Sequence, residues 1–122
     1  MTFEHIGLYA RDPIALVEWY CTALGFTVVR RLERGDRPPV FFLRTDSGAQ
    51  LEVLPTDRPP LARDLDSPGF SHLGLLVEDF AAFEQRLKAH NVKLWGVRTT
   101  SHGWKIGYFN DPEGNVLEII QR

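Results

Sequence analysis

The stretch FEHIGLYARD (Phe3–Asp12) recurs as FSHLGLLVED (Phe70–Asp79), 67 positions further along the chain. The two stretches share phenylalanine, histidine, glycine, leucine and aspartate, which makes five identities in ten positions. Near the end of each half, GAQLEVL (Gly48–Leu54) aligns with GNVLEII (Gly114–Ile120) at an offset of 66, with glycine, leucine and glutamate in common. Because the two offsets agree within one residue, we interpret the halves as copies of one structural unit.

Each copy opens with a short strand-like run that ends at an aspartate suited to cap a helix. Asp12 precedes Pro13, whose fixed φ and missing N–H favour the first helical position, and Asp79 occupies the same place in the second copy. Apolar residues follow at helical spacing, namely Ile14, Leu16, Val17, Tyr20 and Leu24 in the first copy and Phe80, Phe83 and Leu87 in the second. The sequence therefore predicts one helix in each half, ending near Gly25 and near His90.

Three strand-like runs separated by turn-forming residues follow each predicted helix. They are FTVVRRLERG, PVFFLRT and QLEVL in the first copy and VKLWGV, KIGYFN and NVLEII in the second. The sequence thus predicts an α+β fold of two tandem βαβββ units, residues 1–56 and 69–122. A linker rich in proline and charge, residues 57–68, joins them, and a chain of 122 residues fits a single domain.

Composition and charge exclude several classes of partner. A formal net charge of −2 provides no basic field for phosphates, so we expect no nucleic-acid partner. No run of about 18 apolar residues occurs, so we expect no membrane-spanning helix. The first residues lack the basic and apolar regions of a signal peptide, so we expect a mature protein that starts near Met1 and stays in the cytoplasm.

Four residues in the repeated stretches need an explanation. His5 and His72 occupy the same position in the two opening strands, and Glu52 and Glu118 the same position in the two closing ones. Each glutamate interrupts an apolar run, where an ionised carboxylate would cost several kcal/mol unless a cation or strong donors meet it. The separation from histidine to glutamate is also nearly constant, at 47 and 46 positions.

A single histidine or glutamate in a strand is more often an ordinary polar group than a metal ligand. Recurrence of both residue types at both repeat positions favours ligation instead. Two imidazoles and two carboxylates suit one divalent ion of Ni, Co, Zn, Mn or Fe, with positions left for water or substrate. We therefore predict a metal site formed by His5, Glu52, His72 and Glu118.

At the level of whole motifs, the sequence resembles the vicinal-oxygen-chelate superfamily, which includes glyoxalase I, extradiol dioxygenases, fosfomycin-resistance proteins and bleomycin-binding proteins. The resemblance is carried by HIGL near the start, WYCTALGF (Trp19–Phe26), HLGLLVED in the middle and FNDPEGNVLEII (Phe109–Ile120). It implies a cupped, eight-stranded mixed sheet built from the two units, with the metal in the cup, and a homodimer.

The order His, Glu, His, Glu looks like bacterial glyoxalase I, so the resemblance implies a metal-dependent lyase or isomerase. Such an enzyme moves a proton next to a carbonyl of a small oxygen-chelating substrate, and Glu118 or Glu52 would be the base. The alternatives are a metal-dependent dioxygenase, a fosfomycin-type thiol transferase, and a non-catalytic drug-binding protein of the bleomycin-resistance kind. A dioxygenase or transferase of this superfamily uses two histidines and one carboxylate, so Glu52 favours the lyase branch.

The sequence departs from glyoxalase I at two positions that help that enzyme to hold glutathione. An arginine and an asparagine are usual there, and this chain has Tyr9 and Thr56 instead. Glutathione recognition is therefore not implied. The segment from Gly96 to Gly107 is a candidate lid or anion contact that carries Arg98, and its alternative is an exposed turn.

Overall fold

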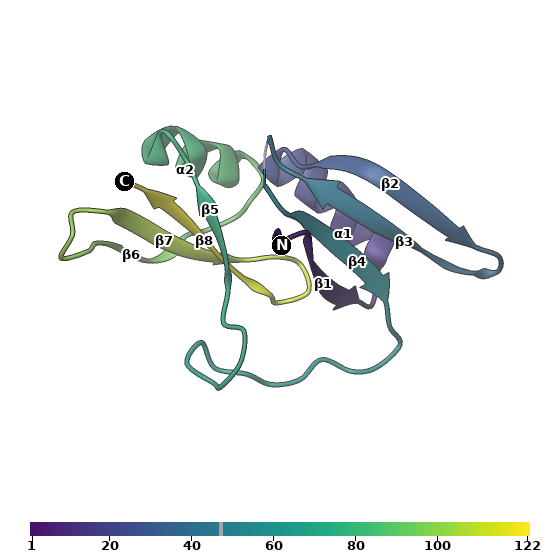
Figure 1. Ribbon diagram of the computed structural model, residues 1–122. Helices are drawn as coiled ribbons and strands as arrows, with labels where there is room; N and C mark the ends of the chain where they lie inside the picture. The colour runs from purple at the N-terminus through teal and green to yellow at the C-terminus, as the bar shows by residue number, and fades with distance from the viewer. Residues whose placement is uncertain (47) are drawn as a thin grey trace. The chain divides into compact units, whose positions relative to one another are not determined.

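The computed structural model describes residues 1–46 and 48–122. In this part of the chain, each half follows the predicted order β-α-β-β-β (Figure 1). The first half contains β1 (His5–Ala10), α1 (Pro13–Trp19) with a π-helical turn η1 (Tyr20–Leu24), β2 (Thr27–Arg34), β3 (Arg37–Arg44) and β4 (Gln50–Pro55). The second contains β5 (Leu73–Leu76), α2 (Phe80–Ala89), β6 (Trp95–Thr99), β7 (Lys105–Asn110) and β8 (Val116–Gln121). The predicted α+β fold with two βαβββ units is confirmed.

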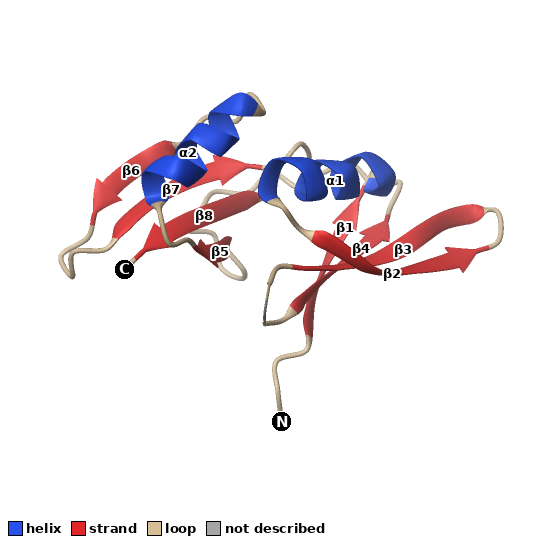
Figure 2. Cartoon of the chain, turned by 90° about the horizontal axis from the view of Figure 1, so that it is seen from above, coloured by secondary structure: helices blue, strands red, loops and turns tan. Residues whose placement is uncertain are grey.

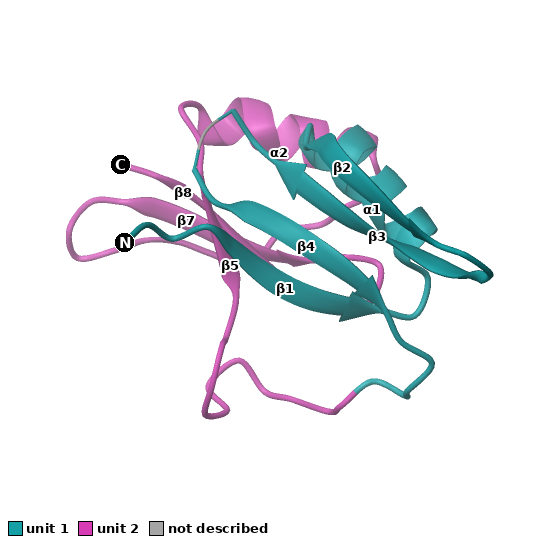
Figure 3. Cartoon of the chain, turned by 45° about the vertical axis from the view of Figure 1, so that its right-hand side comes forward, with its two compact units in different colours: residues 1–60 teal, residues 61–122 magenta. Residues whose placement is uncertain are grey.

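Each half forms one compact unit with its own sheet. The units comprise Met1–Pro60 and Leu61–Arg122 (Figure 3). Their boundary lies inside the predicted linker 57–68, which has no helix or strand. The eight strands of the described residues form two four-stranded sheets, in the orders β1-β4-β3-β2 and β5-β8-β7-β6. β1 is parallel to β4 in the first sheet, and β5 is parallel to β8 in the second. The other neighbouring strands are antiparallel.

Both helices begin at the predicted aspartates. Oδ1 of Asp12 accepts a hydrogen bond from the N–H of Ala15 at 3.1 Å, and Oδ1 of Asp79 accepts one from the N–H of Ala82 at 3.0 Å. Backbone N–H groups in the first turn of a helix have no acceptor inside the helix, and these bonds give two of them a partner. The first helix does not run uniformly to Gly25, because its last turn widens into η1.

One face of each sheet is covered by the helix of its own unit (Figure 2). Leu51 and Val53 of β4 are buried, as are Leu117 and Ile119 of β8. Side chains alternate along a strand, so the residues between these pairs point to the opposite face. One prediction about the helix face is wrong: Ile14 was expected in the apolar stripe of α1, but it is 53% exposed, because it lies on the solvent side of the helix.

The helix of the second unit approaches its sheet closely at Gly107. A Cβ atom added there would lie 3.1 Å from Cζ of Phe80, 3.2 Å from Cγ2 of Val97 and 3.3 Å from Cδ1 of Leu94. At these distances the neighbouring side chains would have to shift, and in a close-packed core such shifts cost free energy. By contrast, a Cβ atom added at Gly74 would meet nothing within 4 Å.

We therefore expect Gly107→Ala to lower the free energy of unfolding by about 1–3 kcal/mol through overpacking. Gly74→Ala, its matched control, should change it by less than about 0.5 kcal/mol. Urea unfolding of the two variants measures both values. Equal stability of the two variants would contradict the close approach of α2 to β7.

Candidate metal-binding half-sites

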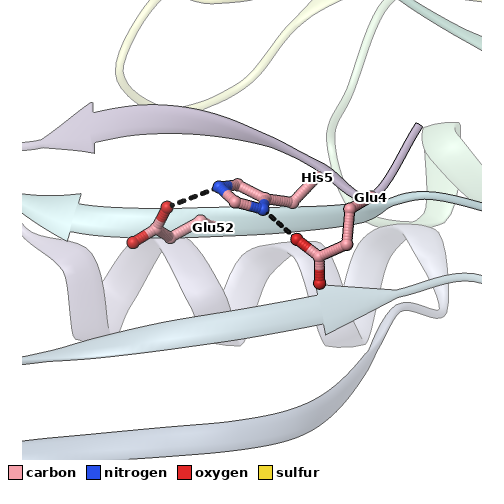
Figure 4. A network of polar contacts seen from close by, with 3 residues as sticks. All are labelled: Glu4, His5 and Glu52. Carbon is pink, nitrogen blue, oxygen red and sulfur yellow. Dashed lines mark hydrogen bonds and ion pairs between the residues drawn. The ribbon is translucent and has the colours of Figure 1, made fainter. Parts of the chain in front are cut away.

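The first predicted pair meets at the parallel junction of β1 and β4. His5 is the first residue of β1, and its Nε2 lies 3.2 Å from Oε2 of Glu52 (Figure 4). The register places Gly7 beside Glu52, and a Cβ atom at Gly7 would lie 3.7 Å from the same carboxylate oxygen. That distance is an ordinary van der Waals contact, so Gly7 lies beside the carboxylate without being required there. The other ring nitrogen of His5, Nδ1, contacts the carboxylate of Glu4.

The second pair repeats this arrangement at β5 and β8. Nε2 of His72 lies 3.2 Å from Oε2 of Glu118, and Nδ1 of His72 lies 3.0 Å from Oγ of Ser71. Gly74 is the register partner of Glu118, as Gly7 is of Glu52. One detail differs from the prediction: His72 was expected within the opening strand, but β5 begins at Leu73, so His72 lies just before it.

An aromatic residue contacts the histidine of each pair. Neither of these two residues was predicted from the sequence. Phe42 is the register partner of Glu52, and its ring centroid lies 5.7 Å from that of His5 at an interplanar angle of 82°. Tyr108 is the register partner of Glu118, and its ring lies 5.5 Å from that of His72, also at 82°. The signal was present in the sequence, because Phe42 and Tyr108 are separated by 66 positions, as Glu52 and Glu118 are.

A hydrogen-bonded turn fixes the start of β8 and therefore the position of Glu118. The carboxylate of Asp111, a residue only 4% exposed, accepts hydrogen bonds from the N–H groups of Glu113 and Asn115. It also accepts one from the side-chain amide of Asn115, at 2.8 Å. These bonds satisfy a charge that would be costly to bury alone. The DPEGN turn of the sequence is thus a rigid support for the second pair.

The glutamates are only partly accessible to solvent. The side chain of Glu52 is 20% exposed and that of Glu118 is 13% exposed, whereas the histidines are 40% and 31% exposed. Each pair therefore presents a carboxylate backed by apolar neighbours and an imidazole that solvent can reach. This arrangement favours a cation at the open side of each pair.

The geometry of each pair fits two ligands of one metal ion. A metal about 2.1 Å from each donor atom would see donors 3.2 Å apart at an angle of about 100°. That angle lies between the roughly 90° of octahedral and the roughly 109° of tetrahedral coordination. Within residues 1–46 and 48–122, the structure shows no group of three or more His, Cys, Asp or Glu residues placed to hold a metal. What it brings together is each histidine with the glutamate of its own unit.

The structure also places Tyr9 and the segment from Gly96 to Gly107. Tyr9 lies in β1 two residues beyond Gly7, and its side chain is 66% exposed. The candidate lid from Gly96 to Gly107 is mostly strand, because β6 ends at Thr99 and β7 begins at Lys105. Thr100 and Trp104 close the short turn between them with a backbone hydrogen bond of 2.8 Å. Most of this segment is therefore strand rather than a connection between strands, and Arg98 belongs to β6 of the second sheet.

Neighbouring carboxylates change the pKa of His5. A hydrogen bond with Glu4 raises the pKa of His5 above its ordinary value of 6.5, and the charges of Glu4 and Glu52 add to this, while burial opposes it. The folded chain then binds this proton more tightly than the unfolded chain does. The resulting stability is fully present below the ordinary pKa and is lost as pH rises through the raised pKa.

We expect Glu4→Gln to lower the pKa of His5 in the metal-free protein, because the main cause of its raised value is removed. Titration of the His5 imidazole by NMR measures the change. Glu78→Gln removes an exposed carboxylate elsewhere and should leave the pKa of His5 where it was. A pKa of His5 that is the same in Glu4→Gln and wild type would rule out the Glu4 contact.

Known proteins resemble this chain over nearly its whole length. The sequence pattern of the Glyoxalase/Bleomycin resistance protein/Dioxygenase superfamily matches residues 2–119. The uncharacterized protein YaeR of Escherichia coli (strain K12) is 30% identical over 125 residues, which cover 98% of this chain and 95% of YaeR.

Solved structures share the fold over nearly the whole chain. The crystal structure of SMU.1112c has a TM-score of 0.83 and 28% identity, with 98% of each chain covered. Lactoylglutathione lyase from Agrobacterium tumefaciens has a TM-score of 0.70 and 20% identity, covering 97% of this chain and 91% of that one. On the evidence of its two βαβββ units and the match over residues 2–119, this chain belongs to the Glyoxalase/Bleomycin resistance protein/Dioxygenase superfamily.

Proposed function

We propose that His5, Glu52, His72 and Glu118 bind one divalent metal ion and that the protein is a metal-dependent lyase or isomerase of the glyoxalase I kind. The observation that carries this proposal is the repeated pair, with a histidine nitrogen 3.2 Å from a glutamate oxygen in each unit. One pair supplies two ligands, too few for the three or four that protein zinc sites use. Two equivalent pairs supply the full set.

The residues divide the expected chemistry between them. A divalent ion of Ni, Co, Zn, Mn or Fe, when bound, polarises the oxygens of a small chelating substrate. Glu52 or Glu118 takes the proton from the carbon next to the carbonyl and returns it to the neighbouring carbon. Glu4 and Ser71 contact the Nδ1 atoms of His5 and His72, and such contacts fix the ring orientation of a ligating histidine.

We infer a homodimer in the cytoplasm with a small-molecule substrate and no nucleic-acid partner. The superfamily match supports the small-molecule part, because members named in it act on or bind small molecules. In the part of the chain that the structure describes, the longest apolar helix falls short of what a bilayer crossing needs. The metal would then bind within one chain or between two.

The main competing function is metal-independent drug binding. The superfamily includes bleomycin resistance proteins, which favours this function. Exposed apolar side chains near Gly7 and Gly74, the register partners of the two glutamates, also favour it. Tyr9 is 66% exposed two residues after Gly7, and Leu76 is 70% exposed two residues after Gly74. A dioxygenase or a fosfomycin-type transferase remains a further alternative, and activity with Ni or Co in place of iron would argue against the dioxygenase.

Metal binding is the first test of the proposal. We expect wild-type protein to bind one divalent ion per chain, and Glu52→Gln and Glu118→Gln each to weaken binding at least about tenfold, because each removes a charged ligand. Equilibrium dialysis with Zn²⁺, Ni²⁺ or Co²⁺ followed by elemental analysis measures both. Glu78→Gln, a control at an exposed position, should bind like wild type.

Loss of metal from the variants of one unit alone would contradict a site shared by both pairs. If wild type binds none of these ions while remaining folded, the metal-dependent function is wrong. Drug binding without metal would then be the better account.

Turnover is the second test. Metal-loaded wild type should isomerise the hemithioacetal formed from methylglyoxal and a thiol, with glutathione compared against other thiols because Tyr9 and Thr56 replace the usual glutathione contacts. Replacing the glutamate that carries the proton should lower kcat by about 10²- to 10⁴-fold. Product formation is followed by absorbance. Metal-loaded protein that turns over none of these adducts would exclude a glyoxalase and leave the other metal-dependent reactions.

A further inference from the structure

Among the differences between the two half-sites, two lie at positions that the internal repeat and the strand register both relate. The first unit has Leu32 and Phe42, where the second unit, 66 positions later, has Arg98 and Tyr108. The strand register supports this equivalence, because Leu32 pairs with Val40 and Arg98 pairs with Ile106, again 66 positions apart. A leucine and a phenylalanine in the first unit thus correspond to an arginine and a tyrosine in the second. The Phe42 ring has a cation of its own nearby, because Cζ of Arg30 lies 5.8 Å from the ring centroid.

In the second unit these residues make a connected network that ends at Glu118. Tyr108 is the cross-strand partner of Glu118, and its ring contacts that of His72. Burial raises the pKa of Tyr108, the charge of Glu118 and hydrogen bonding with it add to the rise, and Arg98 opposes it. The ring of Tyr108 stacks on that of Trp95, with centroids 4.9 Å apart and an interplanar angle of 28°. Nε1 of Trp95 in turn donates to Oδ1 of Asn110 at 2.9 Å, which fixes the indole.

The backbone also holds Tyr108 in place. Gly96 adopts a positive φ of 62°, and a Cβ atom there would lie 3.1 Å from Cδ2 of the Tyr108 ring. A larger residue at position 96 would therefore push the ring away. The strand pairing, the stacked Trp95 ring and the close approach at Gly96 thus hold the Tyr108 ring beside Glu118.

We propose that Tyr108 is a positioning residue: its hydroxyl, held by Arg98, orients the Glu118 carboxylate, so that the half-site of the second unit grips the metal more firmly than that of the first. The inference rests on the proposed function. Phe42, the equivalent residue in the first unit, has no hydroxyl to donate to Glu52. A hydrogen bond to a charged ligand fixes its geometry, and the loss of such a partner typically weakens metal binding by 10- to 100-fold.

Tyr108→Phe gives the second unit the aromatic residue of the first and is the central variant. We expect it to weaken Zn²⁺ affinity about tenfold, measured by competition with a chromophoric chelator, and to change the visible absorption spectrum of the Co²⁺-loaded protein. Arg98→Leu, which likewise introduces the residue of the first unit, should give a smaller change in the same direction. Glu78→Gln changes an exposed residue that belongs to neither half-site and should leave both readouts unchanged.

A double-mutant cycle separates positioning from a general structural role. The effect of Tyr108→Phe on Zn²⁺ affinity should vanish in a Glu118→Gln background and persist in a Glu52→Gln background. The same cycle is run on metal-free protein, with urea unfolding as the readout. There, Tyr108→Phe and Glu118→Gln should be non-additive, while Tyr108→Phe and Glu52→Gln should be additive.

Each outcome decides a specific point. Additive effects of Tyr108→Phe and Glu118→Gln in the metal-free protein would overturn the proposal, whether or not metal binds. Non-additive effects in a wild-type background that binds no metal would support Tyr108 as the residue that positions Glu118 and would refute the metal-dependent function instead. Unchanged Zn²⁺ affinity and Co²⁺ spectrum in Tyr108→Phe would overturn the metal half of the proposal.

Discussion

The alternation of side chains along β4 and β8 is the constraint on which the candidate site depends. Leu51 and Val53 are buried in the core of their unit, on the face of the sheet that the helix covers. Because side chains alternate along a strand, Glu52 between them lies on the opposite face. Leu117, Ile119 and Glu118 repeat this arrangement. A shift of one residue in strand register would bury the glutamate under the helix at a cost of several kcal/mol, so core packing and site geometry fix each other.

The repeat explains why so much was predictable. Two aligned copies specify element order, both helix caps and both His–Glu pairs, because the same local chemistry has to work twice: Asp12 and Asp79 cap helices, and Gly7 and Gly74 lie beside the glutamates. Local rules do not specify how a helix lies on its sheet. The exposure of Ile14 and the widened turn Tyr20–Leu24 depend on that tertiary contact and could not be predicted from periodicity.

Departures from the repeat are as informative as its matches. Phe42 and Tyr108 were missed because an aromatic residue in a strand normally signals core packing, and only the register reveals that each one lies opposite a site glutamate. The difference between them, one hydroxyl, places a potential hydrogen-bond donor on the residue opposite the second glutamate. If the two units share one metal ion as proposed, this difference would give their half-sites unequal affinities for it.

X-ray absorption spectroscopy of the zinc-loaded protein tests whether both histidines bind the same metal ion. A shared site predicts two imidazole nitrogens per zinc at about 2.0–2.1 Å, together with carboxylate oxygens. A spectrum with a single imidazole per zinc would show that each His–Glu pair binds separately. That result would contradict the shared site on which the proposed reaction depends.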